Sequence, residues 1–121
     1  MTPNRLIQVA HLSNPAGTVV RVNFTQMRII APNDLKTISD ELLGLIEPGQ
    51  AKTVLLNFQG VDVMASGGLN ALIVFRKRLL EAGGKLRLCG LNIVLNEAFK
   101  ATQLDKMFEL FPDERTALHD F

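Results

Sequence analysis

An apolar segment followed by a helical pattern and a second strand pattern limits the folds open to this chain more than any other feature. Residues 53–58 are apolar at nearly every position, which is typical of a central strand covered on both faces. A helical pattern then extends from about residue 67 to residue 82, and residues 85–89 alternate as a strand does. A strand–helix–strand crossover is right-handed and makes its two strands parallel. The sequence therefore predicts an α/β domain.

The N-terminal half adds a hairpin and a helix to this unit. Residues 6–12 and 18–24 predict two strands, and the short turn-forming segment between them favours antiparallel pairing. Asn33 or Asp34 is expected to cap the helix that follows, and Glu-Pro-Gly at residues 47–49 is expected to end it. Apolar residues at helical spacing predict its buried stripe: Leu35, Ile38, Leu42, Leu45 and Ile46.

The C-terminal part predicts shorter elements. Asn92 is placed to cap a third helix, residues 104–110 predict a short strand or a packed extension, and Pro112 is expected to open a last short helix. No repeat, low-complexity block or interdomain linker interrupts the chain. We therefore expect a single domain over residues 1–121, a small mixed β-sheet with helices packed on it.

Composition and charge exclude several classes of protein. A net charge of +1 argues against a nucleic-acid-binding surface. No apolar stretch is long enough to insert into a membrane, and the N-terminus lacks the pattern of a signal peptide, so a cytoplasmic protein is expected. The two histidines, His11 and His119, have no neighbours at metal-ligand spacing, and the one cysteine, Cys89, is predicted to be a small buried residue. We expect no catalytic residues, no metal, no cofactor and no enzymatic activity.

The turn between the central strand and the second helix carries Ser66, Gly67 and Gly68. Because glycine costs about 1 kcal/mol relative to alanine in a helix, the two glycines must serve another purpose. Either the backbone adopts a conformation that glycine favours, or another molecule approaches closely. The simplest interpretation of Ser66 is a helix N-cap that accepts from the N–H of Gly68 or Leu69. The alternative keeps this cap and adds phosphorylation of the hydroxyl.

The second helix is predicted to have one buried side and one polar stripe. The residues expected on the buried side are Leu69, Leu72, Ile73, Leu79 and Leu80, with Phe75 and Arg76 at its margins. Asn70, Val74, Lys77 and Glu81 fall together on the opposite stripe. This stripe is either a solvated face with one incidental valine or a surface on which a partner docks.

Several of these segments resemble a known family. Residues 54–61 and 64–69, then 83–92 and 101–108, are similar to the core signature and later segments of the STAS domain, whose bacterial representatives are the anti-sigma factor antagonists. The resemblance is colinear from about residue 52 to residue 118, and the N-terminal half fits in the order of its elements.

The resemblance implies a regulatory switch. Many family members present a serine at the start of this helix, and a kinase of the histidine-kinase-like ATPase superfamily phosphorylates it. The unmodified antagonist captures that serine kinase, which is itself the anti-sigma factor, and phosphorylation breaks the capture. Ser66 matches the acceptor position, and Gly67 and Gly68 match the small residues after it. The partner-binding residues expected from this match are Met64, Ala65, Ser66, Gly67, Gly68, Asn70, Val74 and Lys77.

This chain departs from the usual family pattern at three positions. Ala65 and Asn57 stand where the family usually has aspartate, and Gly67 replaces a second serine. Loss of the carboxylate beside Ser66 favours an alternative, a STAS scaffold or transporter-associated module that is not switched by phosphorylation. A third hypothesis, an enzyme or nucleotide-binding protein, depends only on the glycines at the helix start. The sequence makes no prediction of the oligomeric state.

Overall fold

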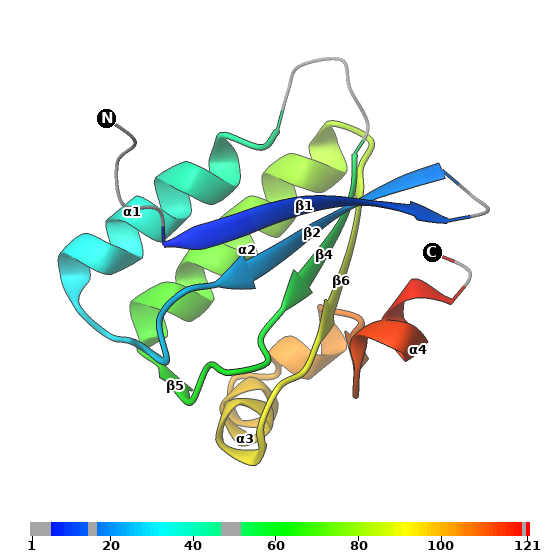
Figure 1. Cartoon of the computed structure of the whole chain (residues 1–121). Coiled ribbons are helices and arrows are strands. Elements are labelled where there is room, and N and C mark those ends of the chain that lie inside the picture. The colour runs from blue at the N-terminus through cyan, green and yellow to red at the C-terminus, as the bar shows by residue number, and fades with distance from the viewer. Residues whose placement is uncertain (1–5, 15–16, 47–51, 120) are drawn as a thin grey trace.

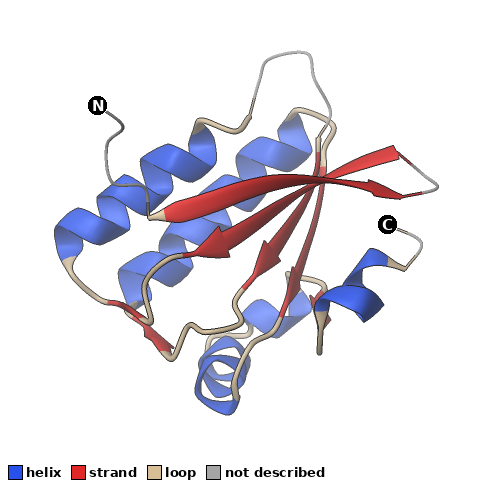
Figure 2. Ribbon diagram, in the orientation of Figure 1, coloured by secondary structure: helices blue, strands red, loops and turns tan. Residues whose placement is uncertain are grey.

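The computed structural model describes residues 6–14, 17–46, 52–119 and 121, and its main element is a five-stranded sheet of order β1-β2-β4-β6-β7 (Figures 1 and 2). The strands are β1 (Ile7–Asn14), β2 (Gly17–Phe24), β4 (Thr53–Asn57), β6 (Lys85–Cys89) and β7 (Leu110–Phe111). β1 pairs with β2 antiparallel, and each later neighbour pairs in parallel. The predicted hairpin and the predicted crossover from β4 to β6 are both confirmed. The residues predicted to end the first helix, 47–49, lie outside the described residues.

Helices cover both faces of this sheet (Figure 1). α1 (Pro32–Leu43) and α2 (Ser66–Glu81) lie side by side on one face, where α3 (Ile93–Ala101) and the 3-10 turn η1 (Leu104–Lys106) extend the same core. α4 (Glu114–Leu118) covers the other face.

The central strand β4 shows why the apolar run is continuous. Val54 and Leu56 belong to the core under α1 and α2, whereas Leu55 belongs to the smaller core under α4. All three side chains are 0% exposed, because successive side chains of a strand point to opposite faces of the sheet. The prediction of a central strand covered on both faces is confirmed.

A second, two-stranded sheet was not predicted. β3 (Arg28–Ile29) pairs in parallel with β5 (Val63–Met64), which leads directly into α2. The N–H of Asp62 donates to the Met27 carbonyl at 2.7 Å, and that of Ala65 donates to the Ile29 carbonyl at 2.8 Å. These bonds fix the segment before Ser66 against the connection between β2 and α1.

The predicted helix caps have different outcomes. The prediction for Asn92 is confirmed, because its Oδ1 accepts from the N–H of Leu95 at 2.8 Å. The prediction for Asn33 or Asp34 is wrong: Ala31 is the N-cap residue of α1, and Asn33 and Asp34 lie inside the first turn. The last helix begins at Glu114 and is capped by Asp113, whose Oδ1 accepts from Thr116, so Pro112 only precedes it.

The buried side of α2 is also shifted from its prediction. Leu80 is 42% exposed, whereas Phe75, predicted at the margin, is 0% exposed. Leu69, Leu72 and Leu79 are buried as predicted.

Candidate functional site

Ser66 is an exposed residue at the start of α2, but it is not the N-cap. Ala65 holds that position, and the N–H groups of Gly68 and Leu69 bond to its carbonyl at 2.8 and 3.4 Å. The interpretation of Ser66 as a capping side chain is therefore wrong by one position. The Ser66 hydroxyl makes no hydrogen bond with any residue that the structure describes, so it is free to meet solvent or another molecule.

Packing within the chain explains the glycine at position 68. Neither Gly67 nor Gly68 has a positive φ, so neither is required by its backbone conformation. A Cβ on Gly68 would lie 2.7 Å from Met64 Sδ, closer than real Cβ atoms approach a neighbour, and 3.2 Å from Leu35 Cδ2, which is tighter than most real Cβ contacts. A Cβ on Gly67 would meet Leu35 Cδ1 at 3.0 Å. The close approach that requires Gly68 is thus made by the chain's own side chains.

The predicted partner-binding residues fall into exposed and buried groups. Ser66, Gly67, Asn70 and Lys77 are exposed, and Ala65 and Val74 are half-buried. Met64 is only 8% exposed and Gly68 is buried, so these two support the surface from beneath and offer a partner little contact area.

A groove of about 240 Å³ runs beside this surface, between α1 and α2. Its lining residues are Leu35, Lys36, Ser39, Asp40, Gly67, Asn70, Ala71 and Val74. The α1 rim carries an ion pair of 3.1 Å between Lys36 and Asp40, both exposed to solvent. Asn70 and Val74, which the sequence placed on one stripe, therefore form one wall of a concave surface that begins next to Ser66.

Exposed apolar side chains lie on the other side of Ser66, and the sequence analysis missed them. Met27 is 62% exposed and Ile93 is 74% exposed. Both lie next to the segment that leads to Ser66. The Asp62 N–H donates to the Met27 carbonyl, and the Nδ2 of Asn92, the residue before Ile93, donates to the Asp62 carbonyl at 2.9 Å. Val94, 53% exposed, extends this apolar surface along α3. One signal in the sequence could have indicated this surface: Ile93 is an apolar residue directly after the Asn92 cap and lies outside the buried stripe of α3.

Asn57, the second departure from the family pattern, has a structural role away from Ser66. It is buried, with 6% of its surface exposed. Its Oδ1 accepts from the N–H of Gln59 at 2.9 Å, and its Nδ2 donates to Glu114 Oε1 at 3.4 Å. The amide therefore connects the end of β4 to α4.

Neither a metal centre nor a reactive thiol is found among the described residues. They contain no group of three or more His, Cys, Asp and Glu side chains that could hold a metal ion. Burial, helped by the carboxylates of Glu114 and Asp113, raises the pKa of the Cys89 thiol to about 11. The thiol is therefore protonated near neutral pH and unsuited to act as a nucleophile. Across the described parts of the chain, every helix is too short or too polar to cross a membrane.

The fold and the sequence together define the class of this protein. The STAS domain sequence model matches residues 18–117, and the chain belongs to the STAS domain family. No curated protein sequence matches the chain significantly.

Solved structures share this fold over nearly the whole chain. An anti-sigma-factor antagonist (STAS) domain protein from Planctomyces limnophilus is 22% identical, with a TM-score of 0.79 over 94% of this chain and 96% of that one. The Bacillus cell fate determinant SpoIIAA in its phosphorylated form is 15% identical, with a TM-score of 0.66 over 91% of this chain and 95% of that one. The murine anion transporter Slc26a9 is 14% identical, with a TM-score of 0.71 over 84% of this chain but only 17% of the transporter.

Proposed function

We propose that this protein is a phosphorylation-switched anti-sigma factor antagonist. In this proposal it is a regulatory protein, not an enzyme, and it acts in the cytoplasm. It binds a serine kinase of the histidine-kinase-like ATPase superfamily, which serves as the anti-sigma factor, and phosphorylation of Ser66 ends the binding. The observation that carries the proposal is an exposed Ser66 hydroxyl without an internal hydrogen bond, at the position where the family has its acceptor serine.

The start of α2 suits a phosphate group. Ser66 and Gly67 occupy the first helical positions, whose N–H groups have no carbonyl partner within the helix. Free N–H groups and the positive end of the helix dipole favour an anion there. Phosphorylation adds about −1.5 to −2 charges at pH 7, and no rearrangement of the fold is needed to accommodate them.

The surface around Ser66 explains how that charge ends binding. Met27, Ile93 and Val94 are exposed apolar residues on one side, and the groove between α1 and α2 lies on the other. Large exposed apolar side chains that gather near one segment are typical of protein interfaces. A partner that covers both surfaces also covers Ser66, and a buried charge without a partner is costly. The switch is therefore electrostatic and local to the interface.

The structures of similar proteins support this function. SpoIIAA matches this fold in structures of both its phosphorylated and its unphosphorylated form. Ala65 is the observation that favours the second candidate, a STAS scaffold or transporter-associated module that phosphorylation does not switch. The similarity to part of Slc26a9 is consistent with such a module.

Phosphosite mapping tests the proposal. The purified chain is incubated with ATP and lysate of its own cell, with a working kinase–substrate pair as positive control, and mapped by mass spectrometry. A phosphate on Ser66 that disappears in Ser66→Ala supports the proposal. An unmodified Ser66 beside a working control contradicts it.

Binding to the captured kinase tests the switch itself. Ser66→Asp is expected to weaken binding at least tenfold, whereas Ser66→Ala keeps full affinity and stays bound in the presence of ATP. Equal affinities for the wild type and both variants would instead support a module that is not switched.

A further inference from the structure

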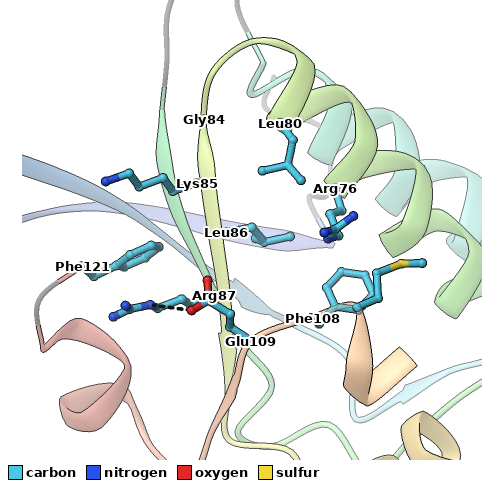
Figure 3. A pocket seen from close by; sticks show the side chains of 10 residues that line it. Arg76, Leu80, Gly84, Lys85, Leu86, Arg87, Phe108, Glu109 and Phe121 are labelled. Carbon is cyan, nitrogen blue, oxygen red and sulfur yellow. Dashed lines mark ion pairs between the residues drawn. The ribbon is translucent and has the colours of Figure 1, made fainter. Parts of the chain in front are cut away.

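A second pocket of about 230 Å³ lies at the start of β6 (Figure 3). It is lined by Arg76 and Leu80 of α2, residues 84–87, Met107, Phe108, Glu109 and Phe121. Leu80 lies fourteen positions after Ser66 in α2, or about 21 Å at the rise of an α-helix. Ser66 and this pocket therefore lie near opposite ends of α2.

The pocket lies along an open edge of the main sheet. β7 pairs only with Leu88 and Cys89 of β6, and the structure places no described strand beside residues 85–87 on the side away from β4. Lys85 N–H donates to the Lys52 carbonyl of the β4 side, whereas Leu88 N–H donates outward to the Glu109 carbonyl. Because bonding alternates along a parallel strand, the N–H and C=O of Leu86 face the open edge. No described strand pairs with these two groups, although the residue as a whole is only 7% exposed, so an added strand must pack closely against the pocket lining.

The side chains beside this edge differ between its two faces. Figure 3 shows Leu86 directed toward Leu80 and Phe108, and Lys85 and Arg87 directed to the opposite side, toward Phe121. Leu80 and Met107 are large apolar residues that are 42% and 40% exposed. An apolar side chain of an added strand, placed opposite Leu86, would cover both.

Positive charge surrounds the edge and is incompletely balanced. Arg76 and Lys85 have no ion-pair partner among the described residues, although the Arg76 guanidinium lies 5.9 Å from the centre of the Phe108 ring. Glu109 carries the one side-chain carboxylate of the lining, and its Oε1 is 3.7 Å from Arg87 Nε. The added strand should therefore carry negative charge.

Arg87 forms a fixed wall of the pocket. Its Nη1 donates to the carbonyls of Ala117 and His119 at 3.0 and 2.8 Å. Its guanidinium lies 4.8 Å from the centre of the Phe111 ring and 4.6 Å from that of Phe121. Its Nε is buried without a hydrogen bond to any described residue. Because these contacts hold Arg87 in place, Arg76 and Lys85 are the cations left to meet a ligand.

We propose that this edge binds a short extended acidic segment of a partner protein by strand addition. One apolar residue of the segment pairs with Leu86 through two backbone hydrogen bonds and covers Leu80 and Met107. An acidic residue next to it points to the opposite face and meets Lys85, whereas an acidic residue two positions away shares the face of the apolar residue and meets Arg76. Backbone pairing with β6 is confined to about three residues of the segment, since Glu109 already bonds to Leu88 and blocks further pairing. Such a site would let the protein hold this partner while another occupies the surface around Ser66.

The test uses a synthetic probe, the peptide acetyl-Glu-Glu-Leu-Glu-Glu-amide, titrated into the ¹⁵N-labelled full chain and followed by NMR. We expect saturable shifts centred on the Leu86 amide and slower hydrogen exchange at that group. The corresponding lysine peptide should bind at least tenfold more weakly. A peptide N-methylated at its leucine lacks one of the two backbone bonds and should bind at least fivefold more weakly.

Variants of the protein provide the matched control. The pair Arg76→Glu and Lys85→Glu should weaken binding of the acidic peptide at least tenfold. The double variant Arg78→Glu and Lys100→Glu makes the same change in net charge at exposed positions outside the pocket, and it should leave the affinity for the peptide within twofold. Thermal unfolding of both double variants checks that they are folded. The proposal is overturned if Leu86 shows no saturable shift. It is equally overturned if N-methylation of the peptide does not weaken its binding and glutarate, a small dicarboxylate, shifts the same amide signals. The pocket would then bind small carboxylates and not a strand.

Discussion

Asn57 Nδ2 lies 3.4 Å from Glu114 Oε1, and this contact joins the end of the central strand to the helix on the second face of the sheet. Glu114 is also held by Arg21, whose Nη1 lies 3.2 Å from both of its carboxylate oxygens. An aspartate at position 57, which the family usually has, would set a second carboxylate against Glu114. The amide at position 57 and the carboxylate at position 114 are therefore matched to each other in this chain.

Asn57→Asp is expected to lower the free energy of unfolding by about 1–3 kcal/mol at pH 7, because a buried donor is replaced by a like charge. Urea denaturation of the full chain measures this difference. In a Glu114→Gln background the same substitution should cost at least about 1 kcal/mol less, which a double-mutant cycle reports directly. An equal cost in both backgrounds would show that the two residues do not interact.

Gly68→Ala is expected to destabilise the protein by about 1–3 kcal/mol, although alanine is the better helix former by about 1 kcal/mol. The added Cβ would meet Met64 Sδ at 2.7 Å and Leu35 Cδ2 at 3.2 Å. Thermal or urea unfolding measures the loss. Gly67→Ala is the control, since its Cβ would meet only the end of the Leu35 side chain, at 3.0 Å, and should cost less. If both substitutions stabilise the protein alike, packing is not the reason for Gly68.

Ser66→Ala should leave the stability unchanged within about 0.5 kcal/mol, because Ala65 is the N-cap residue of α2 and the Ser66 side chain caps nothing. Asn92→Ala is the comparison: its Oδ1 accepts from Leu95 N–H at 2.8 Å, and loss of such a cap costs about 1 kcal/mol. The two variants are compared by urea unfolding. A loss on Ser66→Ala as large as that on Asn92→Ala would restore the capping role.

Local patterns were sufficient to predict most of the fold. The apolar run of residues 53–58 indicated a strand covered on both faces, and the order of the following elements indicated parallel pairing with β6. Asn92 was predicted correctly as a cap because a capping side chain acts within one helical turn. Each of these inferences depends only on residues that are close in sequence.

The parts that could not be predicted depend on contacts between distant residues. β3 and β5 contain two residues each, which is too short for any periodicity. A Cβ at Gly68 is excluded by the side chain of Met64, four residues earlier, together with Leu35 on another helix, and this arrangement exists only in the folded chain. Met27 and Ile93 come near the same segment because the Asp62 N–H donates to the Met27 carbonyl and the Asn92 side-chain amide donates to the Asp62 carbonyl. The place of Ser66 at the strand-to-helix turn and the stripe of Asn70 and Val74 beside it were predicted, but the exposed apolar residues Met27 and Ile93 were not.

Stability should fall in alkaline solution because of Cys89. Burial, followed by the carboxylates of Glu114 and Asp113, raises the pKa of this thiol from 9.0 to about 11. The folded chain therefore keeps a proton that the unfolded chain loses, so the thiol's contribution to stability is complete below about pH 9 and is lost as the pH rises toward 11. The slope is at most about 1.4 kcal/mol per pH unit for one group.

Urea unfolding of the wild type and Cys89→Ala between pH 7 and 10.5 measures this effect. The variant loses some packing at every pH, but its stability should decline less steeply above pH 9, so the two curves converge. The native thiol should also react with a water-soluble disulfide reagent far more slowly than the unfolded chain does at pH 8. Parallel curves together with rapid labelling of the native protein would mean that Cys89 is accessible and titrates at its ordinary pKa.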